Sequence, residues 1–272
     1  AARWRQLRIG DVLAANTHVS VADAVALQRD YLSLPAQRLQ PVLAQLGGGN
    51  ASARAALQML GSWDARLTPD AAAAALFNLW WQHHLLPGYA RATLPADSDA
   101  LVPLADGEAV VDALTARPLD DARRAWLLRT LGAAWDEAVR TLGADSTRWR
   151  WGDLHRMRFK HPLLALTPGA AGKSFALPAW PRGGNADTAN ATTYDEHGFD
   201  VRSGASFRMV LDVGNWDAAR MTNAPGQSGD PRSPFYGSLL EGWAKDDSFP
   251  LLYSRTAIER ATVQRIELLP AR

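Results

Sequence analysis

The most informative segment of the chain is Asn223-Ala224-Pro225-Gly226-Gln227-Ser228-Gly229-Asp230-Pro231-Arg232-Ser233-Pro234-Phe235-Tyr236. Its prolines and glycines predict a structured loop, because proline fixes φ and glycine permits tight turns. Before it, residues 207–213 alternate weakly between apolar and polar side chains, which predicts a strand. After it, residues 236–244 are predicted to form a helix. The segment therefore indicates a loop within a mixed α and β arrangement.

The same segment contains Gly226-Gln227-Ser228-Gly229, which raises the alternative of a serine hydrolase. A nucleophile elbow needs Gly-x-Ser-x-Gly between a strand and a helix. Here the second glycine comes one residue too early, and prolines flank the loop. We interpret Ser228 as a turn residue that hydrogen-bonds to the backbone. An independent serine hydrolase that uses Ser228 remains a competing hypothesis.

The composition is that of a globular chain of 272 residues, with 47% hydrophobic and 21% charged residues. Its net charge of +1 gives no overall field that would attract nucleic acid or an acidic membrane. No apolar run reaches the roughly 18 residues that suggest a membrane span. Cysteine is absent, which excludes disulfides, thiolate metal sites and a cysteine nucleophile. We therefore expect neither a nucleic acid nor a membrane as a partner.

Helical patterns dominate the first half of the chain. Helices are predicted over residues 21–45, 51–60, 68–86 and 120–142. Ser20 followed by Asp23 resembles a capping box at the start of the first helix, and Asn50 is a suitable N-cap for the second. The helix at 120–142 is the clearest, because its apolar side chains recur at spacings of three and four: Leu127, Leu131, Trp135, Ala138 and Leu142.

Prolines are expected to interrupt these helices. Pro35 and Pro41 should break or kink the helix at 21–45, and Pro87-Gly88 should end the helix at 68–86.

The sequence changes character after about Trp149, where glycine and proline become frequent. A second strand is predicted over residues 263–269, and a short helix over 255–261 with Ser254 as its N-cap. The chain thus divides into a mainly helical part, 1–148, and a mixed α/β part, 149–272, which together predict an α+β fold. Two strands do not form a stable sheet alone, so a partner chain is expected to supply the rest.

Two groups of histidines are candidate binding sites. His83 and His84 are adjacent, and adjacent residues on an α-helix point about 100° apart, so a partly packed pair is favoured over a metal site. His155 and His161 frame a basic segment, Arg156-Met157-Arg158-Phe159-Lys160, that has the charge to bind an anion. With little net charge on the chain, a solvated surface is the favoured interpretation.

Two polar segments are further candidate binding sites. Asp195, Glu196, His197 and Asp200 have oxygens that could bind calcium, but the EF-hand order is absent, which favours a polar loop. Gly183-Gly184-Asn185-Ala186-Asp187-Thr188 lacks the spacing of a nucleotide-binding loop, which favours a turn that glycine permits.

Several motifs occur in an order that resembles the C-terminal part of the β-subunit of the penicillin acylase family, the N-terminal-nucleophile amidohydrolases. They are Trp151-Gly152-Asp153-Leu154-His155, Phe159-Lys160-His161-Pro162-Leu163, Gly183-Gly184-Asn185-Ala186-Asp187-Thr188-Ala189-Asn190, residues 206–213, Trp216-Asp217 and residues 223–236. Phe235 departs from the pattern, since many members carry histidine there. The resemblance to this family implies that residues 223–236 form a structural loop.

The N-terminal residues resemble the helical segment just downstream of the family's catalytic arginine. Arg8-Ile9 and residues 19–30 carry this resemblance, and matching on Ile9 puts Arg5 at the catalytic position. Arg3 is a possible substitute, because the matching segment is short. The resemblance implies that Arg5 lies beside the active site and helps organise the nucleophile and an oxyanion-binding asparagine.

The resemblance also implies a fold and a mechanism. The fold is the αββα sandwich, of which this chain supplies the C-terminal segment. The attacking group is an N-terminal Ser whose own α-amine takes the hydroxyl proton, and an acyl-enzyme forms and is hydrolysed. Because this chain begins with Ala1, the Ser, the oxyanion-binding Asn and the calcium carboxylates are expected upstream.

The implied partners are companion chains: the one that carries the N-terminal Ser, and the α-subunit. They would form a periplasmic heterodimer by autoproteolytic processing, with no cofactor in this chain. The implied substrate is a small acylated amide, either an acyl-homoserine lactone or a β-lactam antibiotic, which would connect the protein to quorum quenching or antibiotic resistance. A catalytically inactive scaffold or interaction module of the same fold is the alternative.

Overall fold

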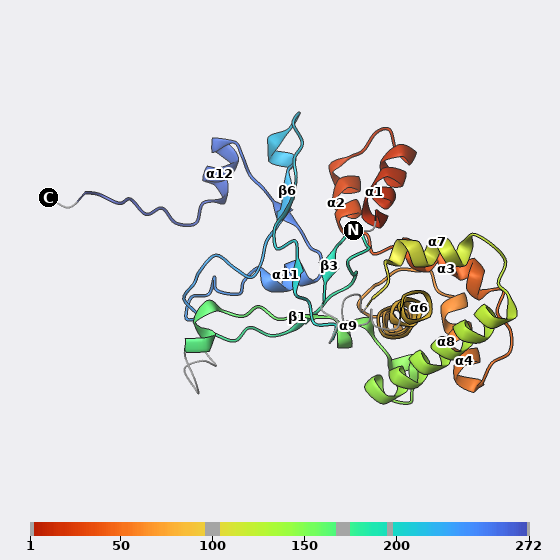
Figure 1. The fold of residues 1–272 in the computed structure, drawn as a ribbon. Coiled ribbons are helices and arrows are strands. Elements are labelled where there is room, and N and C mark those ends of the chain that lie inside the picture. Colours follow the sequence, from red (N-terminus) through yellow and green to blue (C-terminus); the bar gives the residue numbers. More distant parts are fainter. Residues whose placement is uncertain (1–2, 96–103, 167–174, 195–197, 271–272) are drawn as a thin grey trace. The chain divides into compact units, whose positions relative to one another are not determined.

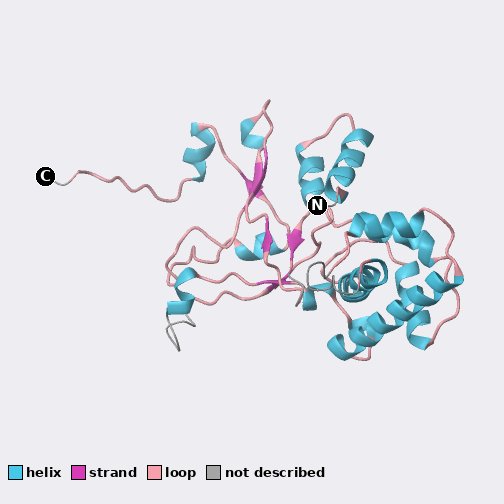
Figure 2. Ribbon diagram, in the orientation of Figure 1, coloured by secondary structure: helices cyan, strands magenta, loops and turns pink. Residues whose placement is uncertain are grey.

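A computed structural model describes residues 3–95, 104–166, 175–194 and 198–270. The chain forms two compact units: Ala1–Thr17 with Arg29–Ala205, and His18–Gln28 with Ser206–Arg272. We call them the first and the second unit. The limits of these units do not coincide with the change of composition at residue 148. The division into 1–148 and 149–272 as parts of a larger subunit stays a prediction. Helices make up much of the described structure, and the strands are short (Figure 2).

The first unit is built mainly from helices (Figure 1). They are α1 (Trp4–Ala15), α3 (Leu34–Leu43), α4 (Ala51–Gly61), α5 (Ala72–Leu79), the π-helical η1 (Trp80–Leu85), α6 (Leu86–Thr93), α7 (Gly107–Thr115), α8 (Asp121–Leu142) and α9 (Trp151–Leu154), with 3-10 turns η3 (Ser146–Arg148) and η4 (Pro162–Leu166). Two antiparallel pairs follow: β1 (Arg156–Met157) with β2 (Trp180–Pro181), and β3 (Thr192–Thr193) with β4 (Ser203–Gly204).

The core of this unit is centred on α8, which packs against α4, α5 and η1. The predicted apolar stripe of this helix is confirmed. Leu127, Leu131 and Ala138 are fully buried, while Trp135 is partly buried with its ring centroid 4.8 Å from that of Trp149. Burial of this stripe, rather than helix propensity, supplies most of the stabilisation.

The predicted N-caps are also confirmed. Asn50 Oδ1 accepts a hydrogen bond from the Ala53 N–H at 2.8 Å at the start of α4. Ser20 and Asp23 bond reciprocally, with the Asp23 N–H 3.1 Å from Ser20 Oγ and the Ser20 N–H 3.0 Å from Asp23 Oδ2. Each such cap is worth about 1 kcal/mol.

Several helix boundaries differ from the prediction, and the helix predicted from residue 68 begins only at Ala72. The helix predicted over 21–45 is two helices, because α2 (Val21–Gln28) ends before α3 begins with Pro35 in its first turn, whereas Pro41 lies inside α3. The helix predicted to end at Pro87-Gly88 continues to Thr93. We attribute this to η1, where the Leu86 N–H donates to Trp81 O five residues back, and the wider turn accommodates a proline ring in the first turn of α6.

The second unit contains a small antiparallel sheet of order β5-β6-β7. Its elements are α2 (Val21–Gln28), β5 (Arg208–Val210), η5 (Trp216–Ala218), β6 (Arg220–Thr222), α11 (Leu240–Ala244), β7 (Phe249–Pro250) and α12 (Arg255–Ala261). The helix α2 packs on β5, and Gln28 Nε2 donates to Met209 O at 3.0 Å. Arg208 and Asp246 form a nearly buried ion pair at 2.9 Å, and Trp243 is buried.

The second unit corrects two further predictions. The helix predicted over 236–244 begins only at Leu240, while α12 is capped by Ser254 as predicted. Residues 263–269 are not a strand. They are extended, with Val263 fully exposed and Leu268 91% exposed. The alternation favours β structure, but within the part of the chain that the structure describes no neighbouring strand pairs with this segment.

The segment 223–236 is a loop closed by backbone hydrogen bonds, as predicted. The Gln227 N–H donates to Phe235 O at 2.8 Å, and a Cβ at Gly226 would lie less than 3.0 Å from the carbonyl oxygens of Phe235 and Tyr236. Ser228 Oγ accepts from the Asp230 N–H at 3.1 Å, the one hydrogen bond of this side chain among the described residues. The loop is therefore built around close backbone contact at Gly226.

We predict that Gly226→Ala destabilises the protein by about 1–3 kcal/mol, because the added methyl overlaps two carbonyl groups. Gly229→Ala is the matched control, since a Cβ there meets nothing within 4 Å. Chemical denaturation of both variants measures the difference. Equal unfolding free energies for the two variants would contradict the described packing.

Candidate functional site

The helix α1 carries the predicted catalytic Arg5, yet it has little packing of its own. Of its residues, Trp4 alone is buried, at 1% exposure. A helix of 12 residues is marginal in water without tertiary contacts, so its position depends on the few contacts that it makes.

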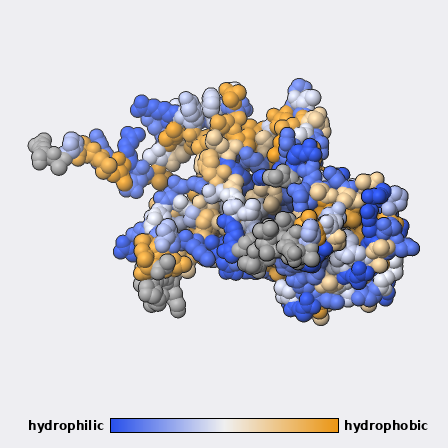
Figure 3. All heavy atoms as spheres, viewed as in Figure 1, coloured by the Kyte–Doolittle hydropathy of each residue, from blue (hydrophilic) through white to orange (hydrophobic). Residues whose placement is uncertain are grey.

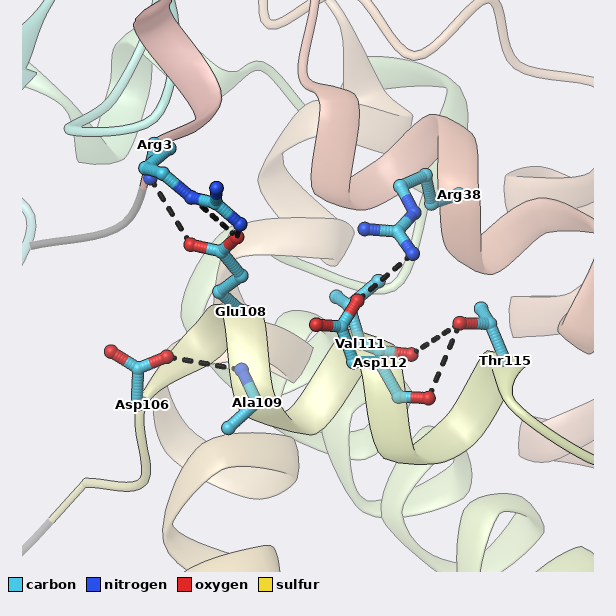
Figure 4. Close-up of polar contacts among 8 residues, drawn as sticks. All are labelled: Arg3, Arg38, Asp106, Glu108, Ala109, Val111, Asp112 and Thr115. Atoms are coloured by element: carbon cyan, nitrogen blue, oxygen red, sulfur yellow. Dashed lines mark hydrogen bonds and ion pairs between the residues drawn. The ribbon is translucent and has the colours of Figure 1, made fainter. Parts of the chain in front are cut away.

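The first of these contacts join the start of α1 to α7 and α3. The Arg3 guanidinium binds Glu108 at 2.6 Å and 3.1 Å, and the Arg3 N–H donates to the same carboxylate at 3.2 Å. Arg38 lies over the Trp4 ring, with Cζ 5.3 Å from its centroid, and donates to Asp112 at 2.9 Å. Figure 4 shows Arg3 and Arg38 both reaching carboxylates of α7. The beginning of α1 is thus fixed by charge and by one buried ring.

A second contact holds α1 one turn further along. Arg8 Nε donates to Asp30 Oδ2 at 2.5 Å, and Arg66 Nη1 donates to Asp30 Oδ1 at 2.9 Å. The Asp30 side chain is only 7% exposed, and it also accepts from the Leu32 N–H at 3.0 Å. Its backbone carbonyl accepts from the Asn190 N–H at 3.0 Å. This residue therefore links α1 to the end of the segment 183–190.

Segment 183–190 is a buried turn of the kind that glycine permits. Gly184 has φ +76°, and a Cβ there would overlap Asn190 O. Thr188 Oγ1 accepts from the Asn185 N–H at 3.1 Å and lies 3.0 Å from Asn190 O, to which it donates. The Trp151 Nε1–H donates to Gly184 O at 3.0 Å, so two of the family-like motifs meet here.

A second layer of polar groups supports this turn from the core. Asn78, buried on α5, accepts at Oδ1 from Asn185 Nδ2 and from the Tyr194 hydroxyl, both at 3.0 Å. His155 is fully buried, with Nδ1 2.6 Å from Phe199 O and Nε2 2.7 Å from Thr192 Oγ1. Nδ1 must therefore carry the proton and Nε2 must accept. Burial lowers the pKa of His155 to about 4, which keeps the ring neutral.

Arg5 lies on the exposed side of α1 and makes no hydrogen bond with the described residues. Its charge acts on Asp187, a partly buried residue of the segment 183–190. Burial raises the pKa of Asp187 to about 6, the Arg5 charge opposes this rise, and the Asp106 carboxylate adds to it. Arg3, the possible substitute, is already paired with Glu108. The geometry thus distinguishes the two arginines, and the catalytic role of Arg5 stays a prediction.

The two adjacent histidines share one partner. His83 Nδ1 and His84 Nε2 lie 2.8 Å and 2.7 Å from the two oxygens of Glu137. Burial would raise the pKa of Glu137, but hydrogen bonds from both rings outweigh it and lower the pKa to about 2. The pair is partly packed as predicted. The expectation that the two histidines do not share a face is wrong, because each reaches the same carboxylate on α8 through a different ring nitrogen. No group of three or more His, Asp or Glu in the described ranges is placed to hold a metal ion.

The remaining candidates hold no site in the described residues. Arg156 pairs with Asp153 and Arg158 with Asp200, both at 3.0 Å, so the basic segment is largely neutralised. Of the acidic segment considered for calcium, Asp195, Glu196 and His197 lie outside the described residues. None of the described helices is both long and apolar enough to cross a membrane.

Sequence reasoning missed the central residues of this network. Asp30, Arg66, Asn78 and Tyr194 were not singled out for any function. Asp30 lies in a segment that carries the family resemblance, but nothing local shows that it meets two arginines from distant positions.

The fold matches part of a solved penicillin acylase structure. The chain is similar to a thermostable penicillin G acylase from Alcaligenes faecalis, with a TM-score of 0.56 and 18% identity over 98% of this chain and 52% of that one. The predicted α+β segment of this fold is confirmed.

The penicillin amidase family model matches residues 1–260, and the chain belongs to this family. It is 33% identical over 280 residues to the penicillin acylase 2 proenzyme of Pseudomonas sp. (strain SE83), and 29% identical over 301 residues to the acyl-homoserine lactone acylase QuiP of Pseudomonas putida. These matches cover 98% and 96% of this chain and 35% of each relative, so the chain spans about a third of their length. The predicted family is confirmed.

The raised pKa of Asp187 predicts how stability depends on pH. Between about pH 4 and 6 the folded protein holds a proton that the unfolded chain releases, so this residue lowers stability as pH rises through that window. Asp187→Asn should be more stable than the wild type by up to about 2 kcal/mol at pH 7 and similar to it near pH 4. Denaturation at both values measures this, with the exposed Asp11→Asn as control. A gain at pH 4 equal to that at pH 7 would contradict the assignment.

Proposed function

We propose that this chain is the C-terminal portion of an acylase that hydrolyses linear amides through an N-terminal Ser carried by a companion chain. One observation supports this most. Arg3, Trp4 and Arg8 fix α1, while Arg5, among the three arginines at positions 3, 5 and 8, is exposed and unpaired among the described residues. A cation held in this way has little to contribute to the fold. It is available to a group outside this chain.

In the proposed reaction, the Ser α-amine takes the hydroxyl proton and the oxygen attacks the acyl carbon of the amide. The tetrahedral intermediate carries negative charge on the former carbonyl oxygen, which an Asn side chain and a backbone N–H would stabilise. Arg5 would orient that Asn and the Ser. The carboxylate of Asp187 would limit the movement of the guanidinium, since the two charges already influence each other.

We further propose that the substrate is a small acylated amide, either an acyl-homoserine lactone or a β-lactam. Support comes from the relatives, which are named as a penicillin acylase and an acyl-homoserine lactone acylase. We also propose, from the family resemblance alone, that calcium binds to the part of the enzyme upstream of this chain and that the enzyme is periplasmic.

Apolar groups left exposed in the second unit support a companion chain. Phe207, Met209, Leu211 and Val213 are between 40% and 78% exposed around β5. The segment 263–270 is extended, and Figure 3 shows hydrophobic side chains along it. Surfaces of this kind mark interaction sites in soluble proteins. We propose that these exposed apolar side chains contact the companion chain.

We predict that Arg5→Ala lowers kcat in the assembled enzyme by about a hundredfold or more, as loss of a residue that organises an oxyanion donor does. Arg3→Ala is the comparison, because it removes one contact at the start of α1, the exposed ion pair with Glu108, and should lower kcat less than Arg5→Ala does. Steady-state kinetics with an acyl-homoserine lactone and with penicillin G measure both. A change confined to KM in Arg5→Ala, or a larger loss in Arg3→Ala, would contradict the assigned role.

The proposed assembly is tested by intact-mass spectrometry with N-terminal sequencing of the purified native protein. A companion chain that begins with Ser, together with amide hydrolysis by the complex, is the expected result. A stable species without any Ser-, Thr- or Cys-initiated chain would favour the inactive scaffold. Amidase activity that Ser228→Ala abolishes would instead favour the independent serine hydrolase.

A further inference from the structure

The first unit contains a cavity of about 320 Å³ among α6, α7 and α8. Its lining includes the rings of Tyr89 and Trp126, the side chains of Ala113 and Leu114, and Arg123. None of the lining residues belongs to the network around Asp30, to the segment 183–190 or to the arginines of α1. The cavity is therefore a feature that the proposed amide hydrolysis leaves unused.

Most of the cavity wall is apolar. The Tyr89 and Trp126 ring centroids are 6.4 Å apart at an angle of 60°, an edge-to-face arrangement, and Leu114 is buried. The Thr93 hydroxyl, which also lines the cavity, donates to Tyr89 O at 2.8 Å and so has no proton to offer a ligand. Cavities of roughly 300 Å³ or more suit small organic molecules. The wall thus fits the apolar body of such a molecule.

Arg123 is the one charged residue among the described residues that line this cavity. Its backbone N–H donates to Asp120 Oδ1 at 2.8 Å, whereas its guanidinium Nε is 3.6 Å from Asp120 Oδ2, beyond hydrogen-bonding distance. Nη1 is buried and has no hydrogen-bond partner in the described residues. The Arg123 side chain as a whole is 33% exposed and lines the cavity, so an acceptor there can pair with the part of the guanidinium that remains accessible.

A guanidinium presents its N–H groups in a planar fork that matches a carboxylate. Asp120 offsets the charge of Arg123 only in part, because its side chain is 63% exposed and accepts the Arg123 backbone N–H as the N-cap of α8. We propose that the cavity binds a small carboxylic acid with an apolar body, such as a medium-chain fatty acid. Its carboxylate lies at Arg123, and its chain lies against Tyr89, Trp126 and Leu114.

Calorimetric titration of the purified protein with octanoate tests this site. The wild type should bind octanoate saturably, and Arg123→Gln should bind it at least about tenfold more weakly, the factor that 1.4 kcal/mol represents. Arg129→Gln removes the same charge from an exposed position of the same helix and should bind as the wild type does. Octan-1-ol, which has the chain without the charge, should bind at least about tenfold more weakly than octanoate.

A cavity-filling variant separates this site from any other site for an acid. Ala113→Phe places a ring in the space of the chain and should abolish the binding, while its thermal unfolding reports that the fold is intact. It also keeps the proposal testable if Arg123→Gln does not fold. Octanoate binding that survives both variants, or no saturable binding to the wild type, would overturn the proposal. Since these residues are distinct from Arg5, failure here leaves the proposed amide hydrolysis standing.

Discussion

The buried carboxylate of Asp30 is the constraint on which the arrangement of the candidate site depends. It is paired with Arg8 of α1 and with Arg66, and it accepts the Leu32 N–H. A carboxylate at 7% exposure is costly to bury unless it is paired and hydrogen-bonded, and removing one partner leaves an uncompensated charge. Both arginines are therefore held in place by the same electrostatic requirement.

That requirement organises two elements that are far apart in sequence. The Asp30 carboxylate fixes α1 through Arg8, and Trp4 is the one buried residue of that helix. The backbone carbonyl of Asp30 accepts from the Asn190 N–H and so holds the end of the segment 183–190. The segment itself is kept rigid by Gly184 and by the hydroxyl of Thr188. As a result the charge of Arg5 acts on Asp187, whose backbone N–H donates to Asn185 Oδ1 at 2.9 Å, while Arg5 makes no hydrogen bond with the described residues.

Features of the fold that depend on nearby residues were predictable from the sequence, whereas features that depend on distant residues were not. Caps at Asn50 and at Ser20 with Asp23 were predictable, because each depends on residues three positions apart. The stripe of α8 was predictable for the same reason. The helix that continues past Pro87-Gly88 was not, because the π-helical turn that accommodates the proline depends on packing against α8. Residues 263–269 alternate as a strand does, but no described strand pairs with them. The sequence of one segment does not show whether a partner strand is present.

The same distinction between nearby and distant residues holds for the candidate site. Motif order predicted the family, and the turn at 183–190 was predicted from its glycines. The ion pairs of Asp30 were out of reach, because its partners lie 22 and 36 residues away along the chain. The shared partner of His83 and His84 was missed because Glu137 lies 54 and 53 residues further along the chain. Sequence thus predicted which segments matter, while the charges that fix them required the structure.

Hydrogen exchange of α1 in the variant Arg8→Gln tests the central claim most directly. If the pairing with Asp30 holds this helix, its backbone amides after the first turn should exchange at least about tenfold faster than in the wild type, while the amides of α8 remain protected. This outcome would establish Asp30 as the anchor of the helix that carries Arg5. Unchanged protection of α1 in a variant that lacks the Arg8 guanidinium would contradict the account.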